Sequence, residues 1–220
     1  MIAVIDYGLG NIRSVTKALE LVIASSRIEA GPVEVVSRPE ALRRADAAVL
    51  PGVGAFKRGI QNIEGRGLLA PIKDFMNSGK PFLGICLGLQ LLFSESDEDG
   101  LHEGLGIIEG RVVRLTGELK IPHMGWNTVR FASDKADDGA GIFNGIPDNS
   151  YFYFVHSYHG VPADKSWAAG WTEYGDMIAS AVQRDNVWAT QFHPEKSATL
   201  GLKILENFCS RVGQAHHTVP

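Results

Sequence analysis

Short apolar runs alternate with helical patterns through the first half of the chain. Residues 11–23 place Val15, Ala18, Leu19 and Val22 on one face of a helix, and residues 55–77 are helical with a break at Gly65-Arg66-Gly67. We expect one more helix over residues 87–94. Four apolar runs have the length of strands: 2–5, 33–36, 47–50 and 81–85. The first of them has the character of a strand buried on both faces. Strands separated by helices indicate βαβ units and a parallel sheet.

The second half has strand patterns joined by turns, which favours antiparallel pairing. These patterns cover residues 111–115, 128–131, 151–156, 177–183 and 187–192, and Arg184-Asp185-Asn186 has the length of a hairpin turn. Residues 197–212 have the pattern of an amphipathic helix. Residues 133–141 are a polar acidic loop without an assigned role, and residues 213–220 have the character of a frayed tail.

The pattern as a whole predicts a single α/β domain over residues 1–212. We expect an open, mostly parallel central sheet flanked by helices, with an antiparallel C-terminal part. The chain has 220 residues and 45% hydrophobic content, enough for one compact core. Its net charge of −4 and the absence of a basic run argue against nucleic acid as a partner.

The sequence also argues against membranes, secretion and metals. No stretch approaches the roughly 18 apolar residues that span a bilayer, and the first apolar run contains Asp6 and lacks the basic start of a signal peptide. Cys86 and Cys209 fit no zinc spacing, so we expect reduced thiols in a cytoplasmic protein. The remaining histidines have no ligand-like spacing, so we expect no metal: His102, His123, His159, His216 and His217.

Gly84-Ile85-Cys86-Leu87-Gly88 lies between an apolar strand and a helical pattern. It has the form of a nucleophile elbow, in which flanking glycines relieve the crowding of a strained turn. The turn would expose the sulfur at the carboxyl end of the sheet, and the following helix dipole would favour its thiolate. A buried structural cysteine between two packing glycines is the alternative, and the strand and helix on either side favour a catalytic one.

His193-Pro194-Glu195 follows the last predicted strand. In an extended chain, residues two apart face the same side, so Glu195 can hold one ring nitrogen of His193 while the other faces a thiol. Nucleophile, base and orienting acid are the parts of a catalytic triad. A strand that ends in an exposed proline turn is the simpler alternative, and a cysteine elbow in the same sheet favours the triad.

Pro51-Gly52-Val53-Gly54 ends the third predicted strand. Two glycines let the backbone approach a ligand, so N–H groups of Gly52, Val53 and Gly54 could stabilise an oxyanion together with that of Leu87. By itself, Pro-Gly after a strand is usually only a turn. The earlier Gly8-Leu9-Gly10 does not form a dinucleotide loop, because Arg13 stands where the third glycine is needed.

Taken together, these motifs resemble the class I, triad-type glutamine amidotransferases. That family has the glycine loop, the cysteine elbow and the His-Pro-Glu motif in this order, on an open flavodoxin-like α/β sheet. The resemblance implies that Cys86 forms a glutamyl thioester with His193 and Glu195 as its partners, and that no cofactor is needed. It also implies that Gln90, Gly52 and the backbone of His156, Ser157 and Tyr158 hold the substrate glutamine.

Within the family, the chain is most similar to glutaminase subunits of imidazole glycerol phosphate synthases. Five segments carry this resemblance: 5–11, 51–56, Pro122-His123-Met124-Gly125-Trp126-Asn127, 153–158 and 192–197. It implies a heterodimer with a (β/α)8-barrel cyclase subunit, which uses the ammonia to make imidazole glycerol phosphate and an aminoimidazole carboxamide ribonucleotide in histidine biosynthesis. It also implies that Asn11, Trp126, Tyr153 and Lys196 lie near the partner or the ammonia exit.

Three other functions fit parts of the pattern. The first is a glutaminase subunit for anthranilate, pyridoxal phosphate or guanylate synthesis, against which the segment 122–127 argues. The second is a γ-glutamyl hydrolase or cysteine peptidase, against which Gln90 and the loop 51–54 argue. The third is a catalytically silent binding subunit, against which the three filled triad positions argue.

Overall fold

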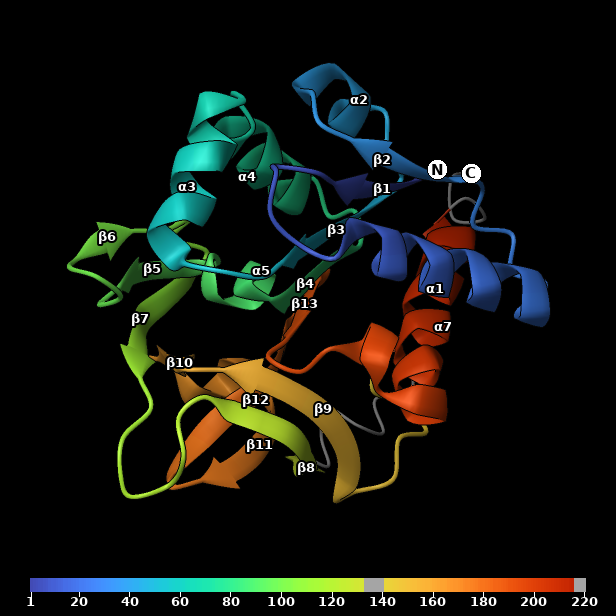
Figure 1. Cartoon of the computed structure of the whole chain (residues 1–220). Helices are drawn as coiled ribbons and strands as arrows, with labels where there is room; N and C mark the ends of the chain where they lie inside the picture. Colours follow the sequence, from blue (N-terminus) through green and yellow to red (C-terminus); the bar gives the residue numbers. More distant parts are fainter. Residues whose placement is uncertain (133–140, 216–220) are drawn as a thin grey trace.

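The structure, a computed structural model, describes residues 1–132 and 141–215 (Figure 1). One sheet contains β1 (Ile2–Ile5), β2 (Val33–Val36), β3 (Ala47–Gly52), β4 (Phe82–Cys86), β8 (His123–Phe131), β9 (Ser150–His156), β11 (Ala168–Tyr174), β12 (Asp176–Arg184) and β13 (Val187–Thr190). A smaller sheet contains β5 (Phe93–Ser96), β6 (His102–Glu103), β7 (Ile108–Arg114) and β10 (Tyr158–Pro162). The helices are α1 (Ile12–Ser26), α2 (Pro39–Arg43), α3 (Phe56–Gly65), α4 (Leu69–Asn77), α5 (Leu87–Gln90) and α7 (Ala198–Ala215), with 3-10 turns η1 (Lys165–Trp167) and η2 (Pro194–Lys196).

The large sheet has the order β2-β1-β3-β4-β13-β12-β11-β8-β9. The first five strands in this order, β2 to β13, are parallel to one another. This is the order 2-1-3-4-5 of flavodoxin-like folds, so the predicted fold class is confirmed. The carboxyl ends of β3, β4 and β13 therefore lie side by side at one edge of the sheet.

The two faces of the parallel half pack against different helices. In β1, Ile2 and Val4 belong to a core shared with α1 and α7, whereas Ala3 and Ile5 belong to a second core shared with α2, α3 and α4. Figure 1 shows α1 and α7 together on one side of the sheet and α3 and α4 on the other. Burial on both faces explains why β1, β3 and β4 are nearly continuous apolar runs, whereas the edge strand β2 contains the exposed Glu34.

The antiparallel half was also predicted correctly in kind. β12 and β13 form a hairpin in which Arg184 pairs with Val187, and Asp185 takes the positive φ of 51° that such a tight turn needs. β12, β11, β8 and β9 then continue the sheet in antiparallel order. Figure 1 shows these strands gathered at the lower end of the molecule.

The predicted helix over residues 87–94 was wrong. Its helical part ends at Gln90, and β5 follows at Phe93. The carbonyls of Leu91, Leu92 and Phe93 accept hydrogen bonds from the backbone of residues 105–108. Tertiary pairing therefore replaces the i to i+4 bonds that would continue the helix, and the small sheet starts here.

Several other elements differ from the prediction. The elements β6, β10, β11 and α2 were not anticipated, and α7 runs to Ala215, past the predicted start of the tail. Residues 133–140 of the predicted acidic loop and residues 216–220 of the predicted tail lie outside the described residues. Within the described part of the chain, no helix combines the length and apolar character that crossing a bilayer requires.

Candidate active site

Cys86 ends β4 and begins the single turn α5 in an uncommon backbone conformation, with φ 56° and ψ −107°. Few non-glycine residues take positive φ, and such strain is typical of functional turns. The flanking glycines are needed sterically. A Cβ at Gly88 would lie 1.8 Å from the Leu50 carbonyl oxygen, and one at Gly84 would lie 2.9 Å from the Gly88 carbonyl oxygen. The backbone thus has the elbow geometry expected from the sequence.

His193 and Glu195 follow β13, beside the Cys86 elbow. The Nδ1 of His193 lies 2.8 Å from Oε1 of Glu195, and both side chains are almost fully buried. His193 itself is extended, but Pro194–Lys196 form a 3-10 turn, so the extended geometry expected for this segment applies only to its first residue. The Ser197 hydroxyl donates to the His193 carbonyl at 2.7 Å and fixes the turn.

The electrostatics of His193 favour its protonated form. Burial alone would lower its pKa, but the neighbouring Cys86 and the hydrogen-bonded Glu195 raise the pKa to about 9. Its Nε2 is buried and makes no regular hydrogen bond within the described residues. The ring therefore has one nitrogen held by Glu195 and the other left for the thiol and its substrate.

A cavity of about 370 Å³ opens beside Cys86. The sequence-predicted residues that line it are Val53, Gly54, Cys86, Leu87, Gln90, His156, Ser157 and Tyr158. Residues that the sequence analysis missed also line it: Glu98, Pro122 and Val155. The volume is sufficient for a small amino acid.

Gln90 and Gln191 form a buried pair of amides between the cavity wall and the thiol. Gln90 Nε2 donates to the Tyr158 carbonyl at 2.8 Å and to Gln191 Oε1 at 3.1 Å. Gln191 Nε2 in turn donates to Cys86 Sγ at 3.7 Å. Gln191 precedes the His-Pro-Glu motif, but only the folded sheet shows that its amide faces the sulfur.

The glycine loop lies against a buried phenol. A Cβ at Gly52 would lie 2.1 Å from the Tyr7 hydroxyl, and Tyr7 is fully buried without a hydrogen-bond partner for that hydroxyl among the described residues. Burial raises the pKa of Tyr7, and the nearby Cys86 raises it further. Gly54 takes a φ of 105°, which supports the expectation that this loop needs glycine.

Glu98 is the carboxylate of the cavity that the sequence analysis did not select. Its Oε2 accepts the Phe56 backbone N–H at 2.6 Å, at the start of α3. In sequence it belongs to Asp97-Glu98-Asp99, an acidic run with the look of a solvated turn. The strand β5 carries this turn to the cavity, and its first two residues, Phe93 and Ser94, had been predicted as helix.

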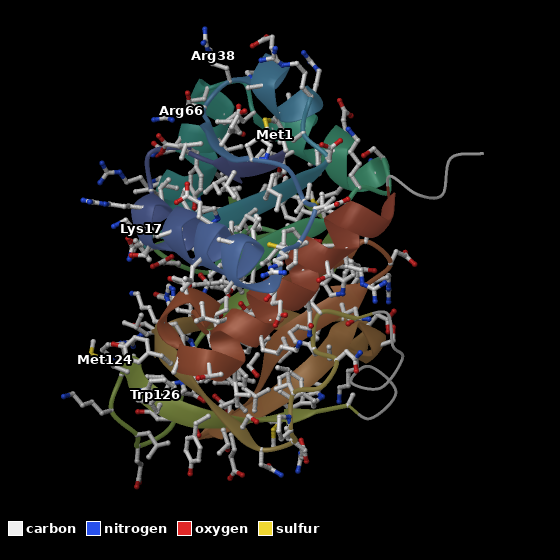
Figure 2. All side chains as sticks on the ribbon, turned by 90° about the vertical axis from the view of Figure 1, so that its right-hand side faces the viewer. Met1, Lys17, Arg38, Arg66, Met124 and Trp126 are labelled. Atoms are coloured by element: carbon white, nitrogen blue, oxygen red, sulfur yellow. The ribbon has the colours of Figure 1, made fainter. Side chains whose placement is uncertain are left out.

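Three of the four predicted interface residues lie together on the surface. Trp126 and Tyr153 have ring centroids 6.2 Å apart, and Lys196 Nζ lies 5.8 Å from the Tyr153 ring. Figure 2 shows Trp126 and its neighbour Met124 projecting at the opposite end of the molecule from Arg38. The fourth, Asn11, is the residue before α1 and makes no side-chain hydrogen bond as a cap. No group of three or more metal-ligating side chains is found in residues 1–132 and 141–215.

Comparison with known proteins supplies close relatives. Residues 3–212 match the family Glutamine amidotransferase class-I. The imidazole glycerol phosphate synthase subunit HisH of Syntrophotalea carbinolica is 50% identical over 215 residues, which cover 94% of this chain and 98% of that protein. The HisH subunit of Aquifex aeolicus is 48% identical and covers 93% of this chain and 94% of its own.

Solved structures agree on the fold at low sequence identity. A glutamine amidotransferase crystal structure aligns with a TM-score of 0.71 at 17% identity, over 97% of this chain and 100% of that one. The glutaminase domain of Trypanosoma brucei CTPS with bound acivicin aligns with a TM-score of 0.68 at 16% identity, over 97% and 93%. With the family match over residues 3–212 and the full-length relatives, the chain belongs to the class I glutamine amidotransferase family, in its HisH branch.

Proposed function

We propose that this chain is the glutaminase subunit of an imidazole glycerol phosphate synthase. It hydrolyses glutamine to glutamate and ammonia, and it passes the ammonia to a cyclase subunit in histidine biosynthesis. The observation that supports this most directly is the meeting of Cys86 with the buried His193–Glu195 pair, beside a cavity lined by Gln90. Residues 1–212 act as one amidotransferase domain, and its free thiols fit a cytoplasmic protein.

The reaction begins with attack of Cys86 Sγ on the side-chain carbonyl carbon of glutamine. His193 holds the thiol proton on Nε2, and Glu195 stabilises the resulting imidazolium through Nδ1. When the C–N bond breaks, His193 gives this proton to the departing nitrogen, which leaves as ammonia. The product on the enzyme is a glutamyl thioester.

Water completes the cycle. His193 takes a proton from the water as its oxygen attacks the thioester carbon, and the C–S bond then breaks. The proton returns to the sulfur, and glutamate leaves. One glutamine and one water thus give one glutamate and one ammonia, and Cys86 ends as it began.

Both steps pass through a tetrahedral oxyanion. In this proposal the Leu87 N–H, which follows the nucleophile in the elbow, is one donor to the oxyanion, and the loop Gly52-Val53-Gly54 supplies a second. Leu87, Val53 and Gly54 line the cavity, which supports these roles. In the cavity, Gln90 and the backbone of His156, Ser157 and Tyr158 hold the substrate. The Glu98 carboxylate lines the same cavity and fits the ammonium group of an amino acid.

The partner is a (β/α)8-barrel cyclase that forms a heterodimer with this chain. The contact surface of this chain includes Trp126 and Asn11, Tyr153 lines the ammonia channel, and Lys196 lies near the ammonia exit. Supporting this, β8 exposes two large apolar side chains two residues apart on the same face of the strand, Met124 by 62% and Trp126 by 52%. Direct transfer makes chemical sense because free ammonia is protonated and lost in neutral water.

The decisive measurement is glutamate release from glutamine by the purified chain, alone and with the cyclase subunit and its nucleotide ligand. We expect low activity alone and a strong rise in the complex. Cys86→Ala should abolish the activity without weakening the complex, and Cys209→Ala, which removes the other buried thiol, should keep it. Equal turnover with and without the partner would refute the synthase assignment, and full activity in Cys86→Ala would refute the mechanism.

A further inference from the structure

Two imidazoles face each other on the inner side of the β8–β9 pair. His123 and His156 are directly opposite in the antiparallel register, and their exposed fractions are only 3% and 6%. His123 Nδ1 lies 2.9 Å from His156 Nε2. Neither ring has a carboxylate partner in the hydrogen bonds of the described residues, so the pair does not repeat the arrangement of His193.

The orientation of the Asn127 amide determines which nitrogen donates and which accepts in this histidine pair. Asn127 Oδ1 accepts the Thr128 N–H at 2.8 Å, and its Nδ2 donates to the Glu173 carbonyl at 3.0 Å, so two backbone groups set the amide orientation. The same Nδ2 lies 3.3 Å from His123 Nε2, which must therefore be the acceptor.

The rest of the chain of hydrogen bonds follows from that assignment. If Nε2 of His123 accepts, its Nδ1 carries the proton and donates to His156 Nε2. His156 Nδ1 then carries a proton too and donates to the Tyr158 carbonyl at 2.9 Å. Both rings are thus neutral Nδ1–H tautomers, in line with burial, which lowers the pKa of His123 to about 4 and that of His156 to about 3.

This chain of hydrogen bonds ends in the glutamine pocket. The Tyr158 carbonyl accepts a second hydrogen bond from Gln90 Nε2, and that nitrogen also donates to Gln191. Because both N–H bonds of Gln90 are used in this way, its Oε1 is the atom that remains to accept a hydrogen bond from a substrate. The orientation of that oxygen depends on the position of the Tyr158 carbonyl.

The other end of this chain of hydrogen bonds lies on β8, the strand that faces the proposed partner. His123 and Asn127 point inward from β8, whereas Met124 and Trp126 alternate with them and are exposed. A shift of β8 on docking would therefore move His123 relative to His156. In β8, Met124 and Trp126 therefore face the proposed partner, while the neighbouring His123 begins the chain of hydrogen bonds that leads to the pocket.

We propose that His123 is a positioning residue for glutamine: through His156 and the Tyr158 carbonyl, it sets the orientation of the Gln90 amide, and so couples the partner-facing strand β8 to the substrate pocket. This inference rests on the proposed glutaminase function. A packing role alone is the competing explanation, because His123 also stacks on Phe154 and Tyr174, with ring centroids 4.7 and 3.9 Å away.

A pair of variants separates the hydrogen bond from the stacking. His123→Asn loses the ring but keeps an amide N–H near the position of Nδ1, whereas His123→Leu has almost the same shape as asparagine and no donor. In the complex with the cyclase subunit and its nucleotide ligand, we expect His123→Leu to raise KM for glutamine about fivefold or more, with kcat within about threefold. His123→Asn should recover most of the wild-type KM. Equal KM values in the two variants would overturn the proposal.

A second measurement does not depend on activity or on either variant folding. Nitrogen-15 NMR of the imidazoles, recorded on the full chain carrying Cys86→Ala, should show His123 and His156 as neutral Nδ1–H tautomers from about pH 5.5 to 8. An Nε2–H tautomer for either ring, or protonation in that range, would overturn the proposal. A wild-type complex that releases no glutamate would instead refute the proposed function, and the NMR result would still report whether the chain of hydrogen bonds exists.

Discussion

His193 holds its proton more tightly in the folded chain than it would in an unfolded one. Although burial opposes this, Cys86 and Glu195 raise its pKa from the ordinary 6.5 to about 9. Such a group contributes stability that is fully present below about pH 6.5 and is lost as the pH rises through about 9. We expect the free energy of unfolding, measured with urea, to fall between these values. The decline should be smaller in Cys86→Ala, and equal declines would contradict the role of the thiol.

Glu195→Gln tests the carboxylate at nearly constant shape. Because the amide cannot stabilise an imidazolium by charge, we expect kcat/KM for glutamine to fall about ten- to hundredfold, a smaller loss than in Cys86→Ala. Glu206→Gln changes a partly exposed glutamate of α7 that pairs with Lys203, and it should leave kcat/KM unchanged. A Glu195→Gln complex with wild-type kcat/KM would show that orientation by Glu195 is unimportant.

At the residue scale, the sequence pointed to the candidate triad and missed the side chains that surround it. Cys86, His193 and Glu195 were recognisable because strained turns and proline-fixed turns leave local signatures, the glycines and Pro194. Glu98 and Gln191 lack such signatures. A glutamate in an acidic run and a glutamine after a strand become part of a site only when the turn after β5 brings Glu98 to the cavity and β13 brings Gln191 to Cys86.

At the scale of elements, the contact between β3 and the Cys86 elbow is tight enough to test with one methyl group. Gly88→Ala would place a carbon 1.8 Å from the Leu50 carbonyl oxygen, so we expect a loss of about 1–3 kcal/mol in unfolding free energy and a loss of glutaminase activity. Gly65→Ala is the control, because its Cβ meets nothing within 4 Å. That variant should be neutral or slightly stabilising. A Gly88→Ala chain as stable and active as Gly65→Ala would contradict the packing.

Helices and strands were predicted correctly where the sequence shows a regular pattern of buried positions. They were predicted wrongly where hydrogen bonds to residues far away in the sequence decide the structure. The run 2–5 became β1 with the same bounds, since two helical layers bury both its faces. Residues 91–93 are as apolar as a helix face, but the backbone of residues 105–108 competes for their carbonyls. The sequence of residues 87–94 alone therefore could not show that backbone N–H groups of residues 105–108 would take these carbonyls.

At the scale of the molecule, the exposed face of β8 should govern association with the cyclase subunit. We expect Trp126→Ala to weaken binding about tenfold or more, and Met124→Ala by a smaller factor, with little change in unfolding free energy. Leu101→Ala provides a matched control, because Leu101 is exposed by 64%, close to the 62% of Met124, and lies between β5 and β6. Calorimetric titration with the cyclase would measure all three. If all three variants bound the cyclase as tightly as the wild-type chain, the contact surface would lie elsewhere.

The overall topology was predictable in class but not in full. Alternating strands and helices indicate a parallel sheet on general grounds, and turn-linked strands indicate an antiparallel extension. The division into two sheets was not predictable, because β10 pairs with β7 while β9, two residues earlier, pairs with β8. A change of sheet within two residues depends on which edges are open in three dimensions.

The position of β13 has a consequence for how the protein is made. This strand lies at the centre of the large sheet, between β4 and β12, although it is the last strand among the described residues. During translation, the amino-terminal half can begin to fold while β4 still lacks its neighbour and Cys86 lacks its base. An open central edge is a template for mispairing, so the nascent chain is most vulnerable to aggregation at this stage. For the same reason, we expect no glutamine hydrolysis by a ribosome-bound chain until His193, which follows β13, has been synthesised.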